Sequence, residues 1–340
     1  MLKIAGRPIE IQHIMTGCRA ISGTIFSQHD LETHDESGIR LREALLGVPG
    51  GVIIGEPRPA SVDDLLRVHS PSHIRMIREL CMHGGQHFID HNTYVTTRSF
   101  EVASHAAGAA IGAVDCALGG EHCFALVRPP GHHAEPDRAM GFCLFNNAAV
   151  AASAALDRVR RVAIVDWDLH HGNGTQKIFY TSDSVLFCSV HQGNTFPRTG
   201  WVDEIGEGPG RGCTINAPLR AGGTIADYRY VFEQVFLPAI RQYRPGVLIV
   251  SAGQDPLADD PKSGMRLAPP DFGVLTSLLR SSVSTPIALV LEGGYGPSHG
   301  EAIRRIFSAL STDIPVQETG DVVPRESTQK TVSTLKKLIF

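Results

Sequence analysis

The sequence has no long hydrophobic run and no strong excess of charge of either sign. No apolar stretch reaches the roughly 18 residues that a membrane-spanning helix needs, so we expect no membrane association. A formal net charge of -4, with no basic run beyond the final STLKKLIF, argues against a nucleic-acid partner. The opening MLKIAGRPIEIQHI lacks the basic and then apolar layout of a signal peptide, which favours a bacterial cytoplasmic protein.

Paired cysteine motifs and linkers are also missing. The seven cysteines are scattered without a Cys-x-x-Cys pair, so we expect free, buried thiols in a reducing cytosol. There is no internal repeat, low-complexity linker or break in composition. A chain of 340 residues that is 42% hydrophobic can bury a large core, and we predict a single domain over residues 1–340.

Short apolar runs rich in β-branched residues alternate with helical patterns. Each run predicts a strand buried on both faces of a parallel sheet: 123–127, 162–166, 185–190, 247–252 and 287–292. Helices are predicted over 102–118, 146–161 and 225–243, the last with a kink near Pro238. This alternation predicts a three-layer α/β/α fold around a mostly parallel sheet.

Four loops should carry the chemistry, because ligands of open α/β sheets bind at the carboxyl ends of the strands. These loops follow residues 127, 166, 252 and 292. In the first loop, His132 and His133 come after Pro-Pro-Gly. Adjacent side chains diverge, so the two imidazoles can play different roles. The alternative is a loop with two exposed histidines.

The second and third loops offer metal ligands. Asp166, Asp168 and His170 alternate after the strand at 162–166, so in an extended chain they share one face. Asp255 follows the predicted strand at 247–252. Three oxygen and nitrogen ligands with an open position are typical of a catalytic zinc or iron site. The alternatives are a surface salt-bridge cluster and an Asp that only caps a turn.

The fourth loop places Tyr295 after Gly293 and Gly294. A phenol there can donate a hydrogen bond to a developing oxyanion, although packing in a glycine-rich turn is the commoner use of tyrosine. The four loops together predict metal-activated hydrolysis of a carbonyl compound.

Several long stretches resemble the histone deacetylase family, which includes bacterial histone deacetylase-like amidohydrolases and acetylpolyamine amidohydrolases. The resemblance begins near SQHDLETHDESGIRL and covers most of the chain. Its strongest motifs are RPPGHHAEPDRAMGFCLFNN, VDWDLHHGNGTQKIFY, SVHQGNTFPRTG, SAGQDPLADDP and LEGGYG. At Asn173 in HHGNG, the sequence resembles the branch of the family that contains the bacterial amidohydrolases. The resemblance implies the arginase/deacetylase fold, with an eight-stranded sheet.

The resemblance also implies one Zn²⁺ per chain. Asp168, His170 and Asp255 match its ligands, and His133 matches the general base that deprotonates water and then protonates the leaving amine. Tyr295 matches the residue that polarises the acetyl carbonyl.

Further positions match supporting parts of the family's site. His132 matches a neighbour held by an acid, here Asp166. Gly141, Phe142 and Phe196 match the walls of the family's narrow acyl-lysine channel. A monovalent-cation site, usually K⁺, matches the backbone near Asp166, Asp168, His170 and Ser189, and a second such site matches Phe179, Ser182 and Val185.

Lys262 departs from relatives that act on polyamines, in which an acid at the channel rim can recruit the cation. Lys262 would repel a polyamine, and Arg198 adds a second positive charge nearby. We therefore expect acetylated polyamines to be poor substrates and an acidic group near the amide to be favourable. The alternative is that Lys262 simply points to solvent. Gln254, before the third ligand, is a further departure, expected to alter hydrogen bonding around the site.

The sequence thus predicts a zinc-dependent amidohydrolase that removes acetyl or a similar short acyl group from acetyl-lysine or a small acylated amine. The alternatives are an acetylpolyamine deacetylase, an arginase-like hydrolase with two manganese ions, and a non-catalytic protein that binds acyl ligands. The resemblance leaves the oligomeric state open, from a monomer to a homo-oligomer.

Overall fold

The computed structural model describes residues 3–4, 7–8, 17–31, 33–284, 286–311 and 323–340. Most of residues 1–14, the opening segment that lacks the layout of a signal peptide, lies outside these ranges. The centre is an eight-stranded sheet of order β10-β9-β8-β11-β12-β7-β3-β4. Every neighbouring pair in it is parallel, which confirms the predicted fold class. Its strands are β3 (Cys18–Ile21), β4 (Ile53–Gly55), β7 (His122–Ala125), β8 (Val162–Asp166), β9 (Val185–Gln192), β10 (Thr214–Leu219), β11 (Val247–Ala252) and β12 (Ile287–Leu291).

The five predicted strands correspond to β7, β8, β9, β11 and β12. Every residue of β8, β11 and β12 is buried, which explains their continuous apolar runs. The sequence analysis missed β3, β4 and β10. These three lie toward the two edges of the sheet, and β3 and β4 are only 4 and 3 residues long. Short strands near an edge do not need an apolar run.

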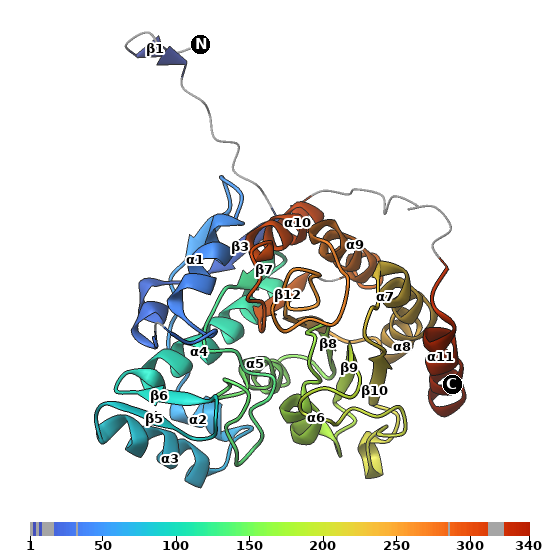
Figure 1. Ribbon diagram of the computed structural model, residues 1–340, viewed down its shortest axis with the longest axis horizontal. Coiled ribbons are helices and arrows are strands. Elements are labelled where there is room, and N and C mark those ends of the chain that lie inside the picture. The colour runs from blue at the N-terminus through green and yellow to red at the C-terminus, as the bar shows by residue number, and fades with distance from the viewer. Residues whose placement is uncertain (1–2, 5–6, 9–16, 32, 285, 312–322) are drawn as a thin grey trace.

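Helices cover both faces of the sheet (Figure 1). α4 (Ser99–Leu118) and α5 (Asn147–Ala155) pack together on one side, and α9 (Pro269–Arg280) and α10 (His299–Ser311) pack together on the other. The remaining helices are α1 (Gly38–Leu46), α2 (Val62–Leu66), α3 (Pro71–Met82), α6 (Asn173–Phe179), α7 (Ile225–Val231), α8 (Leu237–Tyr243) and α11 (Glu326–Ile339). Short turns of helix are η1 (Thr24–Gln28), η2 (Gly208–Gly210) and the π-helical η3 (Phe232–Phe236), and two small hairpins pair β1 (Lys3–Ile4) with β2 (Arg7–Pro8) and β5 (Gln86–Phe88) with β6 (Tyr94–Thr96).

Local sequence explains the main departures from the predicted helices. α5 begins as predicted, since the Asn146 side chain accepts a hydrogen bond from the Ala149 N–H, but it ends at Ala155 rather than at 161. Within 225–243, the helix continues through η3 into α8, and Pro238 lies two residues after the end of the wider π-helical turn. The glycines of α4 permit close packing, because a Cβ on Gly108 would lie 1.9 Å from a backbone oxygen.

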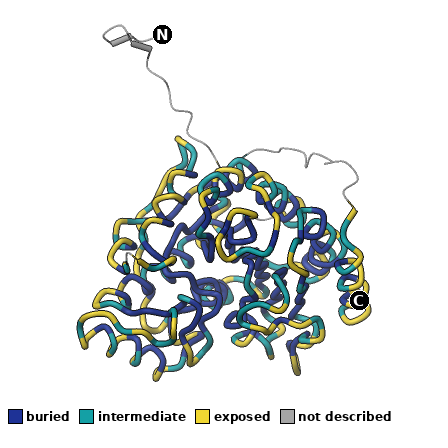
Figure 2. The backbone as a smooth tube through the Cα atoms, in the orientation of Figure 1, coloured by how far each residue is buried: buried dark blue, intermediate teal, exposed yellow. Residues whose placement is uncertain are grey.

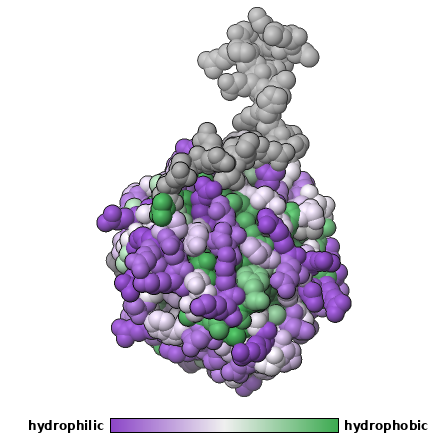
Figure 3. Space-filling model, turned by 90° about the vertical axis from the view of Figure 1, so that its right-hand side faces the viewer, coloured by the Kyte–Doolittle hydropathy of each residue, from purple (hydrophilic) through white to green (hydrophobic). Residues whose placement is uncertain are grey.

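Burial follows the layers: the strands are buried and the outer helix faces are exposed (Figure 2). The side of the molecule shown in Figure 3 is mostly hydrophilic, with apolar side chains scattered between polar ones. Among the described residues, no helix is both long enough and apolar enough to cross a membrane.

The strand order positions the site. β8, β11, β12 and β7 are consecutive neighbours in the middle of the sheet, and all run in the same direction. Their four carboxyl-terminal loops therefore meet at one edge, as the sequence predicts.

Candidate active site

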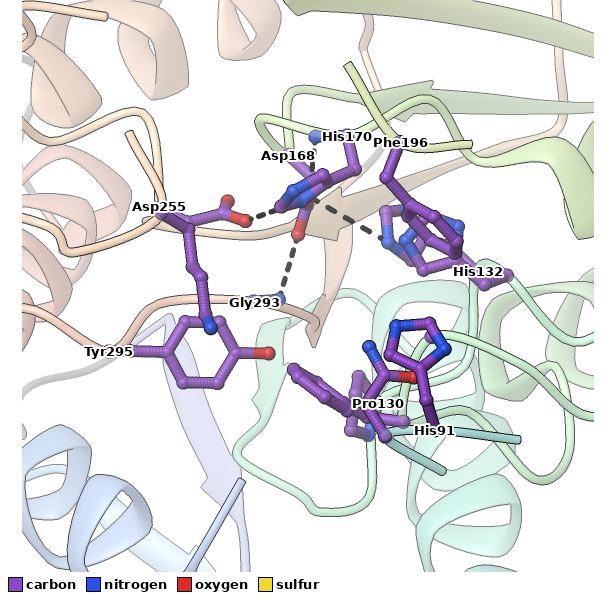
Figure 4. Close-up of a pocket in the computed structure, with 14 residues that line it drawn as sticks. His91, Pro130, His132, Asp168, His170, Phe196, Asp255, Gly293 and Tyr295 are labelled. Carbon is purple, nitrogen blue, oxygen red and sulfur yellow. Dashed lines mark hydrogen bonds and ion pairs between the residues drawn. The ribbon is translucent and has the colours of Figure 1, made fainter. Parts of the chain in front are cut away.

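Two aspartates and one histidine converge at the carboxyl ends of β8 and β11. The ligand atoms of Asp168, His170 and Asp255 all lie within 4.8 Å of one another. Backbone groups orient both carboxylates: Gly293 N–H donates to Asp168 Oδ2 at 2.8 Å, and Leu169 N–H donates to Asp255 Oδ1 at 2.9 Å. In Figure 4, the three side chains point toward one another.

The electrostatics of this cluster fit a divalent cation. Burial, together with the neighbouring charge of Asp168, raises the pKa of Asp255 to about 7. Burial alone would lower the pKa of His170, but both carboxylates outweigh it and raise the pKa to about 9. Buried carboxylates this close need a compensating positive charge. Two carboxylates and one imidazole are also a donor set that zinc accepts.

The tandem histidines have different partners, as their adjacency suggested. His132 Nδ1 donates to Asp166 Oδ2 at 3.0 Å, so Asp166 faces the imidazole rather than the ligand cluster. Burial opposes protonation of His132, but Asp168 and Asp166 outweigh it and raise the pKa of His132 well above its usual value.

His133 has a neutral partner instead. Its Nδ1 lies 2.8 Å from Asn173 Oδ1, while the Asn173 amide donates to Glu135 at 2.9 Å. The Asn173 oxygen therefore faces His133, which places the imidazole proton on Nδ1 and leaves Nε2 as an acceptor. Burial and the nearby charges of His132 and His170 lower the pKa of His133 well below its usual value. His133 is thus a neutral imidazole, the form that a general base requires.

Tyr295 faces the same pocket from the loop after β12 (Figure 4). Burial raises its pKa, so the phenol keeps its proton and can donate it in a hydrogen bond. The Arg40 guanidinium lies 4.9 Å from the centre of the Tyr295 ring, and Phe142 contacts the ring edge-on at 5.7 Å. The Asp260 carboxylate accepts from the Tyr295 N–H at 2.6 Å and fixes the loop.

Comparison with known proteins gives this geometry a family. The histone deacetylase domain model matches residues 34–310. The chain is 40% identical over 274 residues to the histone deacetylase-like amidohydrolase of Pseudomonas aeruginosa, which covers 78% of this chain and 70% of that protein. The chain belongs to the histone deacetylase family. The predicted family is therefore confirmed.

Other members show how far the similarity extends. The solved structure of the HDA15 HD domain superposes with a TM-score of 0.89 at 31% identity, over 95% of this chain and 96% of that one. Histone deacetylase 5 of Arabidopsis thaliana is 35% identical over 333 residues, which cover 91% of this chain. This chain covers only 50% of that relative and 34% of histone deacetylase HDA1 of Candida albicans.

The walls of the pocket are built from special backbone positions. Gly141 has φ +58°, and a Cβ there would lie 2.5 Å from the His133 ring. Phe142 follows with φ 70°, which is unusual for a non-glycine residue. Phe196 packs edge-on against His133 at 5.0 Å. These three residues line a pocket of about 200 Å³ that also contains the ligand cluster and Tyr295.

The sequence analysis missed residues that hold the site together. Glu292 is fully buried and accepts from Gly131 N–H at 2.7 Å, His132 N–H at 3.1 Å and Ser251 Oγ–H at 3.0 Å. It therefore ties the loop after β12 to the loop after β7. Its position, directly before Gly293, was the available signal, because a buried acid at the end of an apolar strand needs partners.

His171 is the other missed support. Its Nδ1 lies 2.7 Å from Thr199 Oγ1, and its Nε2 lies 3.0 Å from Gln176 Oε1. His171 therefore anchors the chain three residues after Phe196 and is turned away from the ligand cluster.

Lys262 lies at the pocket rim and is paired with another side chain. Its Nζ lies 2.5 Å from Asp35 Oδ2, so the lysine does not simply point to solvent. His91 and Asn92, from the loop between β5 and β6, line the rim beside it, whereas Arg198 does not line this pocket. Gln254 is buried, and its amide donates to the Ala252 carbonyl at 2.5 Å.

The residues matched to the first monovalent-cation site lie at the end of β8, on the loop after it and in β9, and those matched to the second lie between the last residue of α6 and the first residue of β9. Ser189 Oγ is 2.9 Å from His191 Nδ1, and the Phe179 carbonyl accepts from Ser182 N–H at 2.9 Å. Val185 begins β9. A K⁺ site at either place stays a prediction.

Proposed function

We propose that the protein is a zinc-dependent amidohydrolase that removes acetyl or a similar short acyl group from an amine. The observation that carries this proposal is the position of Asp168, His170 and Asp255 beside the neutral imidazole of His133 and the protonated phenol of Tyr295. The proposal includes a single catalytic domain over residues 1–340 and a cytoplasmic enzyme.

The side chains suggest a division of labour. Asp168, His170 and Asp255 would hold Zn²⁺, which, when bound, supplies a Lewis acid for the hydrolysis. His133 Nε2 takes a proton from the attacking water and later donates it to the leaving amine. Tyr295 donates a hydrogen bond to the carbonyl oxygen as negative charge develops there. His132 is held by Asp166, whose carboxylate favours the protonated imidazole close to the reacting atoms.

The pocket shape supports a slender acyl amine as the substrate. Two aromatic side chains, Phe142 and Phe196, line a space of about 200 Å³. Flat aromatic walls can hold a linear aliphatic chain and leave no room for a bulky group. Acetyl-lysine and small acylated amines both satisfy this requirement.

A fluorogenic acetyl-lysine assay tests the reaction. We expect turnover that a hydroxamate inhibits, that chelation removes and that Zn²⁺ restores, with about one zinc per chain by metal analysis. Full activity after complete metal removal would contradict the proposal. Two manganese ions per chain would favour the arginase-like alternative, and inactivity of the zinc-loaded protein on a broad acyl-amide panel would favour the binding protein.

A binding measurement isolates the metal site from catalysis. We expect Zn²⁺ to raise the melting temperature of the wild type, because a ligand that binds only the folded state stabilises it. Asp255→Ala removes one of the three ligands and should abolish this shift. Asp259→Ala is the matched control, because this nearby aspartate is exposed and bonds Ser298 rather than the cluster, so it should retain the shift.

We further propose that Lys262 disfavours cationic substrates at the rim. Asp35 compensates part of the charge of Lys262, so substitutions at the two positions can make the rim either more negative or more positive. Lys262→Glu should raise the kcat/KM for acetylputrescine relative to an acetyl-lysine peptide, and Asp35→Asn should lower that ratio. If acetylputrescine is already the best wild-type substrate, or if neither variant changes the ratio, Lys262 does not set selectivity.

A further inference from the structure

A pair of cysteines lies outside the catalytic pocket, where α4 ends and β7 begins. Cys116 is in the last turn of α4 and is partly exposed, whereas Cys123 is in β7 and is fully buried. A tight turn joins the two elements, since both Gly119 and Glu121 donate their N–H groups to the Cys116 carbonyl, at 3.0 and 3.1 Å.

Strand register and helix periodicity bring the two thiols to the same side of the sheet. Arg19 of β3 pairs in register with Cys123 of β7, so their side chains point to the same face. Ile21, two residues along β3, shares that face and contacts Gly112 of α4, because a Cβ there would lie 2.9 Å from Ile21 Cδ1. Cys116 is one helical turn after Gly112, so it too faces this part of the sheet.

The two thiols share their side of the sheet with Arg19, whose guanidinium is ion-paired with Glu121 at 2.5 Å. The neighbouring Cys123 thiol, more than the Arg19 guanidinium, lowers the pKa of Cys116 to about 7. Arg19 and Cys116 both line a surface hollow of about 510 Å³, which gives small molecules access to the partly exposed sulfur. Thiolate character combined with access is what makes a cysteine reactive.

We propose that Cys116 is a peroxide-reactive thiol that forms a disulfide with Cys123. The Cys116 thiolate attacks a peroxide oxygen and breaks the O–O bond, which gives a sulfenic acid and, after protonation of the leaving hydroxide, water. The Cys123 thiol then attacks the sulfenic sulfur, and its proton leaves with the displaced hydroxyl group as a second water. Two thiols are oxidised and one hydrogen peroxide is reduced.

Intact-mass analysis of the full chain after treatment with hydrogen peroxide tests the proposal. We expect a loss of about 2 Da in the wild type, from the two hydrogens that leave with the disulfide. Cys116→Ser should abolish the change. Cys123→Ser should stop at the sulfenic acid, with a gain of about 16 Da that dimedone traps at Cys116. An unchanged wild-type mass, or a loss that persists in Cys116→Ser, would overturn the proposal.

Cys213 provides a matched control within the chain. It is the other partly exposed cysteine among the described residues, but burial raises its pKa. At neutral pH we expect iodoacetamide to alkylate Cys116 at least about tenfold faster than Cys213, because the thiolate is the reacting form. The peroxide-induced mass change should survive Cys213→Ser. Equal alkylation rates, or loss of the mass change in Cys213→Ser, would contradict a special role for Cys116.

Discussion

At the scale of single residues, the surroundings of each titratable group in the pocket determine its protonation state. His133 faces a neutral amide and stays neutral, and Tyr295 is held protonated by burial. We expect His133→Ala and Tyr295→Phe each to reduce kcat by about 100-fold or more. The first variant loses the group that transfers the proton, and the second loses the hydrogen-bond donor to the carbonyl oxygen. Zinc content should stay at the wild-type level in both variants. A near-normal rate in either would refute the role proposed for that residue.

Asn173 offers a test of how the protonation of His133 is set. Asn173→Asp places a carboxylate near Nδ1, in place of the amide oxygen now 2.8 Å away. An opposite charge at this distance raises the pKa of an imidazole by about 1–3 units, so less His133 is neutral at a given pH. The acidic limb of the kcat/KM profile should therefore move to higher pH. Asn173→Ser, which adds no charge, is the control, and equal profiles for the two variants would argue against this explanation.

At the scale of elements, Glu292 couples the loops after β12 and β7. Glu292→Gln can keep all three contacts, since its carbonyl accepts from Gly131 and His132 and its amide donates to Ser251 Oγ. Glu292→Leu loses them and leaves two buried N–H groups without a partner. We expect Leu to lower kcat at least about tenfold more than Gln, without loss of zinc. Equal effects of the two substitutions would show that the charge of Glu292, rather than its bridging contacts, is what matters.

The elements also show what the sequence could and could not reveal. The central strands were predictable because burial on both faces demands continuous apolar runs, and the loops after them followed from the topology of open α/β sheets. β10 was missed because TINAPL has no such run. Glu292 and His171 were missed as supports because their partners, Gly131 and Thr199, lie far away in sequence and the contacts are ones that only the folded chain defines.

At the scale of the whole molecule, a buried charge cluster joins distant segments. Glu36 is fully buried and accepts from Arg40 Nη1 at 3.0 Å and from Arg128 Nε at 3.0 Å. Arg40 also donates to the Gly294 carbonyl at 3.0 Å. The segment before α1 is thereby fastened to the starts of both the tandem-histidine loop and the Tyr295 loop.

Removing the shared carboxylate should destabilise the fold. Glu36→Gln leaves two buried guanidinium groups without their counter-charge, and breaking a buried ion pair costs about 3–5 kcal/mol. We expect a correspondingly lower free energy of unfolding in denaturant titrations at pH 7. Glu326→Gln, which breaks an exposed pair with Lys330, should change it by at most about 0.5 kcal/mol. Similar values for the two variants would contradict this role of Glu36.

The same cluster predicts that the stability of the fold depends on pH. Burial would raise the pKa of Glu36, but Arg128 and Arg40 outweigh it and hold the pKa below its usual value. A depressed folded-state pKa stabilises the protein above the unfolded value, and this contribution disappears as the pH falls through the folded value. The stability difference between wild type and Glu36→Gln should therefore be full at neutral pH and shrink in acid below about pH 4. A difference that is constant from pH 7 to pH 3 would contradict this expectation.

The strands that deliver the reacting groups occupy the middle of the sheet, in the order β8-β11-β12-β7, while β10 and β4 form its two borders. Additions at the borders can enlarge the molecule or give it new surfaces without disturbing the catalytic geometry. Any rearrangement between the four inner strands would separate His133, the proposed general base, from the proposed metal ligands. Natural variation in size and attachments is therefore expected to accumulate at the margins of such a sheet, while its interior is inherited as a unit.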